Sequence, residues 1–236
     1  MSAPVRQIDP RGTRKTGFTL PEKSRREKDR AVRLLDALHE RYPDVRCELD
    51  YTNAHELLAA TILSAQATDV GVNKATPGLF AAFPTPADYA AATPETIEPH
   101  IRTIGLFRNK AKSIHAAMSR ICDVYDGAVP DDMDDLLSLR GVARKTAGVV
   151  LGNAFGIQMG VVVDTHVMRL SQRCGLSTAT TAIAIERDLM ALFPRPRWTL
   201  ASHLLIFHGR RVCKARGNTC ADDAICRTYC SEAHSA

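Results

Sequence analysis

The sequence predicts an all-α protein of about ten helices joined by short connections. Apolar residues recur at helical spacing through most of the 236 residues, and residues that start or stop helices flank these stretches. Only the valine run at 161–163 has strong β character, and it is too short and isolated to build a sheet. The hydrophobic content of 45% is that of an ordinary globular protein, and the length permits one large domain or two small ones.

The first helix signals lie before residue 70. Apolar residues of the segment 31–42 repeat at helical spacing, and Pro43 follows as a stop. Asn53, with Glu56 three residues later, resembles a capping box at the start of a second helix over 55–66. These patterns predict two consecutive helices with a short connection.

Four further helix signals follow along the chain. Thr93-Pro94 places a capping residue before a proline in a first helical turn. The segment 109–126 carries one apolar stripe and ends at Gly127. Segments 177–193 and 200–208 are also predicted to be helical, the first because a proline follows it.

The net charge of +5 lies entirely in residues 1–30, which hold nine Lys or Arg and four Asp or Glu. Residues 1–22 are expected to form a flexible basic tail. Two interpretations of the tail stay open: it contacts nucleic-acid phosphates, or it is a solvated terminus without a specific partner.

The sequence gives no sign of a membrane or secreted protein. No apolar run approaches the roughly 20 residues that span a bilayer. The first residues, MSAPVRQIDPRGTRKTG, lack the apolar core of a secretory signal. The protein is therefore expected to stay in the compartment where it is made, without a membrane partner.

Four of the seven cysteines gather near the C-terminus. They lie within 18 residues, while the other three are scattered. In a chain without a secretory signal, such a cluster indicates metal or iron–sulfur ligation rather than disulfides. The four candidate ligands are Cys213, Cys220, Cys226 and Cys230.

Residues 136–156 form a predicted helical hairpin with a glycine turn. One helix is expected to end at Leu139, and the next to begin near Arg144 after the turn 141–143. The amide groups that open the second helix, together with its dipole, are suited to holding a phosphate. The alternative is an ordinary helical hairpin with a purely structural role.

Lys145 and Asp164 are the candidate catalytic side chains. A lysine in the first turn of a helix sits at the positive end of the dipole. That position, with an expected partial burial, favours a neutral amine that attacks carbon. Asp164 is expected to cap the helix that begins at Thr165. Taken singly, a solvated lysine and a simple cap remain the alternatives.

Five segments, in this order, resemble the endonuclease III family of bifunctional DNA glycosylases. The resemblance extends from about residue 27 to Cys230 and is carried by ILSAQATDVGVNKA (62–75), TIGLFRNKA (103–111), GVARKTAGVVL (141–151), VDTHVMRL (163–170) and LLIFHGRRVC (204–213). It implies a two-lobed helix-hairpin-helix glycosylase fold. A six-helix barrel domain over 47–157 would contain the hairpin, and 23–46 with 158–236 would form an iron–sulfur cluster domain.

The resemblance also assigns roles to residues. Lys145 corresponds to the family's nucleophile and Asp164 to its catalytic carboxylate. Gln66 corresponds to the glutamine that enters the space left by the extruded nucleotide, and Leu106 to an apolar wedge. Periodicity alone would make Leu106 a core leucine and Gln66 an amide on a helix surface.

The remaining DNA contacts are expected around the hairpin and in the cysteine loop. They are Arg140, Gly141, Ala143, Arg144 and Lys214. Arg140 and Ala143 replace the proline and the second glycine of the family's hairpin. Ala143 is therefore expected to stiffen or slightly distort the turn.

For the cysteines, the resemblance implies a [4Fe-4S] cluster, with a departure in spacing. The gaps between the four cysteines are six, five and three residues, and Asp223 stands where the family has its third cysteine. Four thiolates in this span still provide the usual ligand set of a cubane cluster. A tetrahedral zinc site would use the same residues and stays open as the alternative.

The function implied is base-excision repair in the bacterial cytoplasm, at the nucleoid. The substrate would be double-stranded DNA with oxidised pyrimidines or abasic sites, bound by a monomer, and nicked by β-elimination through a lysine Schiff base. Two alternatives remain: a monofunctional glycosylase of the same superfamily, against which Lys145 argues, and a helical DNA-binding protein without catalysis.

Overall fold

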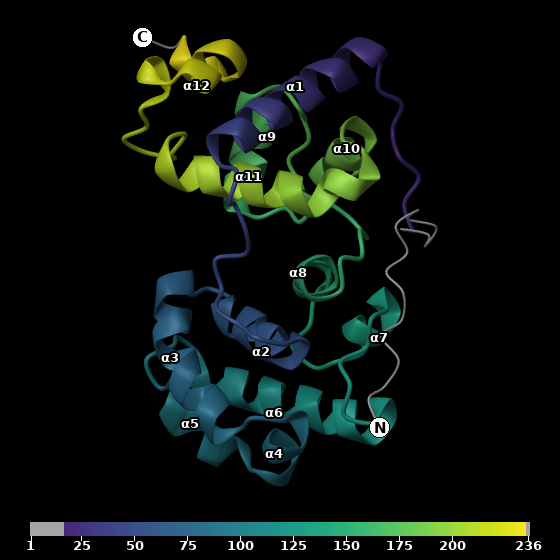
Figure 1. Ribbon diagram of the computed structural model, residues 1–236, viewed down its shortest axis with the longest axis vertical. Helices are drawn as coiled ribbons and strands as arrows, with labels where there is room; N and C mark the ends of the chain where they lie inside the picture. Colours follow the sequence, from purple (N-terminus) through teal and green to yellow (C-terminus); the bar gives the residue numbers. More distant parts are fainter. Residues whose placement is uncertain (1–16, 235–236) are drawn as a thin grey trace. The chain divides into compact units, whose positions relative to one another are not determined.

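A computed structural model describes residues 17–234 of the chain. Twelve α-helices and three 3₁₀ helices account for its regular structure in that range, and no strand occurs there (Figure 1). The predicted all-α class is therefore confirmed. Most of the predicted basic tail, residues 1–16, lies outside the described residues. Between residues 17 and 234, no helix is both long and apolar enough to cross a membrane.

The chain divides into two compact units. One comprises Cys47–Ile157, and the other comprises the segments up to Arg46 and from Gln158 onward. Each unit has contacts chiefly within itself.

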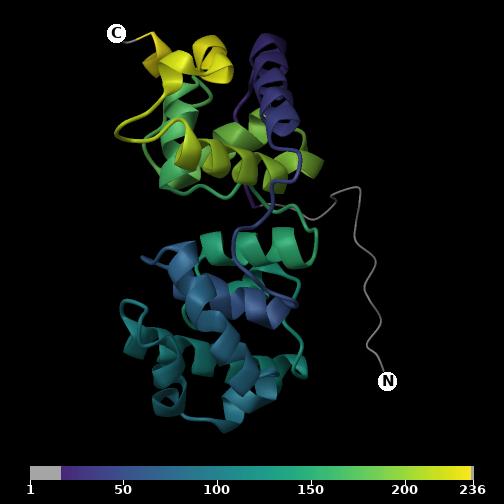
Figure 2. The ribbon, with the colours of Figure 1, turned by 60° about the vertical axis from the view of Figure 1, so that its left-hand side comes forward.

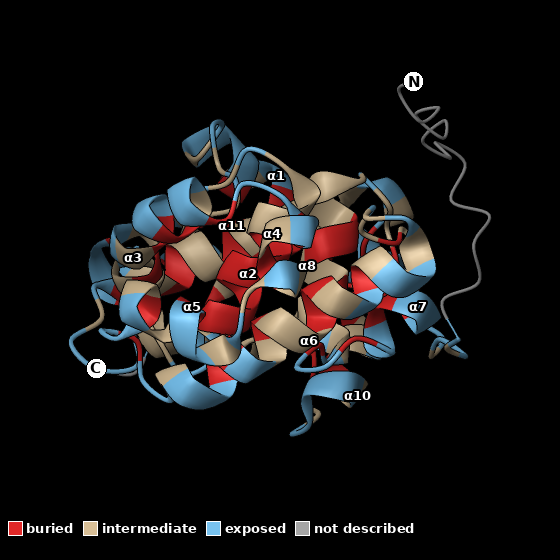
Figure 3. Ribbon diagram, turned by 90° about the horizontal axis from the view of Figure 1, so that it is seen from below, coloured by how far each residue is buried: buried red, intermediate tan, exposed pale blue. Residues whose placement is uncertain are grey.

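The Cys47–Ile157 unit holds seven helices. Helix α6 packs against α4 and α5, and α2 packs against α3, α6 and α8. Helix α2 is the centre of this unit, since every residue from Leu57 to Leu63 is buried (Figure 3). The helices are α2 (Ala54–Ser64), α3 (Asp69–Ala82), α4 (Pro86–Ala91), α5 (Pro94–Ile101), α6 (Phe107–Tyr125), α7 (Met133–Leu137) and α8 (Arg144–Ala154).

The other unit is built around α11. This helix packs against α9 and α1, and in Figure 2 the purple α1 lies beside the yellow-green α11. Its core includes Leu34, Leu35 and Leu204, and the four clustered cysteines belong to the same buried set. The elements are α1 (Arg25–Arg41), α9 (Thr165–Arg173), α10 (Ala182–Leu192), η1 (Arg195–Arg197), α11 (Trp198–Arg211), η2 (Cys220–Asp222), α12 (Ala224–Tyr229) and η3 (Ser231–Ala233).

Helix starts follow local side-chain chemistry. Ser24 and Glu27 form a complete capping box at α1, six residues before the predicted helical segment begins. At α2, the Asn53 side chain accepts from the Glu56 N–H, but the Glu56 carboxylate accepts from the backbone N–H of Thr52. Of the two bonds of the predicted capping box, only the one from the Glu56 N–H to the Asn53 side chain is thus present.

Predicted helix boundaries differ from the structure at two further places. Residues 177–181 are not helical, because the Ser177 hydroxyl bonds the Asp188 carboxylate and accepts from the Ala179 N–H, and α10 starts only after Thr181. Helix α7 ends at Leu137 rather than at residue 139. The valine run 161–163 is irregular backbone and not a strand.

Candidate functional site

The hairpin turn between α7 and α8 depends on Gly141. Its φ is +82°, and a Cβ added there would lie 2.8 Å from the Cβ of Ser113. Side chains are disfavoured at this position both by backbone conformation and by space. The main-chain bond from Val142 N to Leu139 O closes the turn at 3.2 Å.

Helix α8 starts without a side-chain cap. Its N-cap residue is Ala143, which has no side-chain oxygen to accept from the first N–H groups. A helix start of this kind, with its positive dipole end, is suited to an external anion. The backbone of Ala143 is extended, with φ −93° and ψ 168°. Any residue adopts this conformation, so alanine is accommodated here without backbone strain.

Lys145 is the second residue of α8, as predicted, but its expected partial burial is wrong. The buried face of α8 is formed by Ala147, Val150 and Leu151, whereas Lys145 is exposed. Arg140 and Ala143 are exposed as well, and Arg144 is half-buried. The hairpin therefore presents an amine beside an uncapped helix start.

Asp164 is the N-cap of α9, as the sequence predicts. Its Oδ1 accepts from the N–H groups of His166 and Val167, each at 2.8 Å. The side chain is half-buried, and its orientation is fixed by these two bonds. Lys145 belongs to the Cys47–Ile157 unit and Asp164 to the other.

Gln66 and Leu106 lie on two turns with left-handed backbone. The φ values are 56° for Gln66, just after α2, and 60° for Leu106, the N-cap of α6. Leu106 is 59% exposed, and Gln66 is exposed too. The periodicity-based placements, a core leucine and a helix-surface glutamine, are both wrong. Such backbone costs on the order of 1–3 kcal/mol per residue and is common at functional sites.

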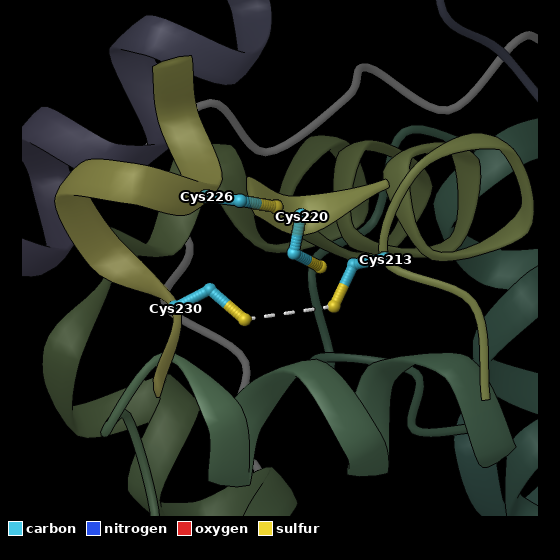
Figure 4. Close-up of side chains that lie close together, drawn as sticks. All are labelled: Cys213, Cys220, Cys226 and Cys230. Carbon is cyan, nitrogen blue, oxygen red and sulfur yellow. Dashed lines mark hydrogen bonds between the residues drawn. The ribbon is translucent and has the colours of Figure 1, made fainter. Parts of the chain in front are cut away.

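The four C-terminal cysteines converge on one point (Figure 4). Their sulfur atoms lie within 4.8 Å of one another, and all four residues are buried. Cys213 follows α11, Cys220 opens η2, Cys226 lies in α12, and Cys230 is the C-cap of α12. The sequence prediction that these residues form one metal-binding group is consistent with this geometry.

The pKa of each clustered thiol depends on the neighbouring thiols and on burial. Hydrogen bonding from Cys226, opposed by burial and aided by Arg173, lowers the pKa of Cys213 to about 5. Burial raises the pKa of Cys220 to about 12. A hydrogen bond from the Cys174 thiol lowers the pKa of Cys230 to about 7. A cationic group that requires four thiolates would therefore displace protons when it binds.

Side chains around Cys226 form a braced network. His208 Nε2 lies 3.3 Å from the Cys226 sulfur, and the Tyr42 hydroxyl lies 3.1 Å from His208 Nδ1. Asp223 caps α12 by accepting from the Cys226 N–H at 2.9 Å, and it pairs with Arg41. Asp223 thus fixes the backbone of Cys226 at the start of α12.

Lys214 lies in the loop between the first two cysteines. It is exposed, and Arg173 donates both to its carbonyl oxygen, at 2.8 Å, and to the Cys213 sulfur, at 3.4 Å. The loop is thereby anchored to α9, with the lysine side chain on the surface.

Two buried residues near these sites escaped the sequence analysis. Cys174 contacts Cys230, and Lys110 is buried in the Cys47–Ile157 unit. A signal for Lys110 was present, since it falls on the same helical stripe as Ala111 and Ile114. Nothing in the local sequence connects Cys174 with a cysteine 56 positions later.

Comparisons with known proteins agree on one relationship. A family model described as "HhH-GPD superfamily base excision DNA repair protein" matches residues 59–195. Endonuclease III of Synechocystis sp. is 52% identical over 204 residues, covering 86% of this chain and 93% of the relative. Endonuclease III of Bacillus subtilis is 43% identical over 189 residues, covering 80% and 86%.

Solved structures give the same result. A non-covalent endonuclease III–DNA complex matches with a TM-score of 0.83 and 42% identity, covering 88% of this chain and 97% of that one. A trapped covalent endonuclease III–DNA intermediate matches equally well. A thermostable thymine-DNA glycosylase, at 20% identity and a TM-score of 0.74, shares the fold.

Proposed function

Because the chain belongs to the endonuclease III family of helix-hairpin-helix base-excision repair proteins, we propose that Lys145 is its nucleophile and Asp164 the carboxylate that assists. The chain is a DNA glycosylase with associated AP lyase activity. One observation supports this assignment most: the lysine in the family's nucleophile position is exposed at the uncapped start of α8.

DNA binding is the first step. The uncapped start of α8 and the Gly141 turn are suited to a backbone phosphate, which supplies affinity without reading sequence. We propose that Arg140, Arg144 and Lys214 add phosphate contacts. Ala143 would contribute through its backbone, since its extended conformation leaves the following amides at the helix start.

Extrusion of the damaged nucleotide is the second step. Flipping a base out of the duplex costs a few kcal/mol, and less when the base is damaged or mispaired. We propose that Gln66 and Leu106 fill the space that the nucleotide leaves. Their exposure on two left-handed turns supports this role, because both side chains stand clear of the core.

The chemical step requires an unprotonated amine. The Lys145 nitrogen would form a bond to C1′ while the glycosidic bond breaks and the departing base takes up a proton. Opening of the sugar ring then gives the Schiff base, and loss of a C2′ proton expels the 3′ phosphate. Asp164 would stabilise the positive charge that develops on the sugar and assist deprotonation of the amine.

We propose oxidised pyrimidines and abasic sites in duplex DNA as the substrates. We further propose that the protein acts as a monomer in the bacterial cytoplasm, at the nucleoid. The similarity to endonuclease III–DNA complexes supports DNA as the substrate. A panel of duplexes, each with one defined lesion, measures the substrate preference directly.

For the cysteine site we propose a [4Fe-4S] cluster held by Cys213, Cys220, Cys226 and Cys230. Four buried thiols fit its ligand set, and the cluster would act as a rigid cross-link of this segment. Zinc, at about 2.3 Å from each sulfur, is the alternative. The sulfur atoms, all within 4.8 Å of one another, are compatible with a single zinc ion, and the resemblance to endonuclease III favours the iron–sulfur cluster. Iron and zinc analysis, with absorption at about 400 nm, decides between them.

The catalytic proposal is tested with an abasic duplex and borohydride. Lys145→Ala is expected to abolish covalent trapping and to lower strand nicking by at least about 10³-fold, while DNA binding persists. Lys112→Ala, an exposed lysine on α6, is the matched control. Trapping that survives in Lys145→Ala would remove Lys145 from this role.

A further inference from the structure

Lys110 is a buried cation in the Cys47–Ile157 unit. Its exposure is 6%, and its Nζ donates to the carbonyl oxygen of Leu63 at 2.8 Å. Within residues 17–234, no carboxylate lies at ion-pair distance from this nitrogen. Burial lowers the pKa of Lys110. An isolated buried charge is unfavourable, so its position calls for a compensating interaction.

The end of α2 supplies that compensation. Leu63 lies in the last turn of α2, where the helix carries partial negative charge and unpaired carbonyl groups. Helix α2 has no basic residue of its own in that turn. Lys110, from α6, therefore caps the C-terminus of a neighbouring helix.

The two left-handed turns adjoin this contact. The Gln66 turn begins where α2 ends, and the Ala67 N–H donates to the Ser64 carbonyl at 3.0 Å. On the other side, the Lys110 N–H donates to the carbonyl of Leu106 at 3.1 Å. Lys110 thus contacts both turns. Its backbone N–H bonds the Leu106 turn, and its side chain bonds the end of α2, just before Gln66.

We propose that Lys110 is a positioning residue that holds the Gln66 and Leu106 turns in one fixed arrangement, so that both side chains enter a duplex together. The inference rests on the proposed gap-filling roles of these two residues. Left-handed backbone is unfavourable for glutamine and leucine, so the surrounding structure must hold it. A preorganised pair loses less conformational freedom on binding than two independent turns.

The test variant is Lys110→Met, which keeps the apolar stem and removes the ammonium. Loss of a buried charge offsets part of the lost hydrogen bond, so the unit is expected to stay folded. The matched control is Lys112→Met, because Lys112 is exposed on the same helix. If Lys110→Met does not fold, Lys110→Leu takes its place, because leucine is neutral and apolar and cannot donate to the Leu63 carbonyl oxygen.

The readout is 2-aminopurine fluorescence in duplex DNA that carries a non-cleavable abasic analogue. The probe is placed next to the position opposite the analogue, so that a duplex gapped at that position keeps the probe. Lys110→Met is expected to slow the fluorescence change about tenfold, as displaced functional groups commonly do. Gln66→Ala and Leu106→Ala should slow the fluorescence change too. In a variant that carries both of these changes, adding Lys110→Met should have little further effect. A duplex with a one-nucleotide gap opposite the analogue needs no filling, and there the loss should be small.

The outcomes separate the inference from the proposed function. If the fluorescence change of Lys110→Met is as fast as that of wild type and Lys112→Met, the positioning role alone is overturned. This holds when Gln66→Ala and Leu106→Ala are slow in the same assay. An equal loss on paired and gapped duplexes also overturns it, because a general structural defect predicts that pattern. Wild-type protein without any fluorescence change or Lys145-dependent trapping would instead contradict the proposed function.

Discussion

The hairpin turn and the cysteine site are built in opposite ways. At the hairpin, Gly141 and Lys145 are exposed, and an alanine stands where most of the other α-helices carry a side-chain oxygen. At the cysteine site, four sulfurs are buried and side chains from α1, α9 and α11 brace them. Unused donors on the surface suit a ligand that comes and goes, whereas a braced interior suits a resident group.

The largest effect is expected from removing one of the four proposed metal ligands. Cys213→Ala should abolish stoichiometric metal binding and lower the melting temperature by on the order of 10 °C, because metal binding and folding are coupled. Metal analysis and calorimetry measure both. Cys122→Ala, a half-buried cysteine outside the site, is the control. Full metal content in Cys213→Ala would contradict the assignment of this ligand.

A smaller loss is expected at the hairpin turn. Gly141→Ala forces a side chain into left-handed backbone and against Ser113, and should cost about 1–3 kcal/mol of unfolding free energy. Duplex affinity should fall with it. Ala143→Gly is the companion variant, since its backbone is extended, and should change stability by no more than about 1 kcal/mol. If Gly141→Ala and Ala143→Gly changed the unfolding free energy equally, a special backbone requirement at position 141 would be refuted.

The brace around Cys226 predicts a selective change. Asp223→Asn keeps the cap of α12 but loses the ion pair with Arg41. Release of the bound metal to a chelator should be about tenfold faster, as is typical when a partner of a ligand is altered. Asp222→Asn, an exposed neighbour, serves as control. Unchanged release from Asp223→Asn would show that the ion pair does not support the site.

The smallest effect concerns single phosphate contacts. Arg140→Gln and Lys214→Gln should each reduce the slope of log affinity against log salt by about 0.9 and weaken all duplexes alike. Fluorescence anisotropy over a salt series measures the slope. An unchanged slope in either variant would exclude that side chain as a phosphate contact.

Local patterns were sufficient for most helices and for grouping the four clustered cysteines. Caps and apolar periodicity located most helices, and the four cysteines were recognised because they are close in sequence. Features that depend on contacts between residues far apart in the sequence could not be predicted from local patterns. The irregular backbone at 177–181 depends on Asp188, and the burial of Lys110 depends on Leu63, 47 residues away.

The same limit applies to the candidate site. The position of Lys145 in the first turn of α8 was predictable, but its exposure depends on which face of α8 packs into the unit. The function of Asp223 likewise needs Arg41, which is 182 residues distant. The roles of Gln66 and Leu106 came from family resemblance, since periodicity pointed to other environments.

The most direct test of the account is the identity of the lysine that becomes attached to DNA. Wild-type protein is trapped on an abasic duplex with borohydride, digested, and the modified peptide is sequenced by mass spectrometry. If Lys145 is the nucleophile, the sugar remnant is found on the peptide that contains Lys145. A remnant on any other lysine, or on the N-terminal amine, would contradict it.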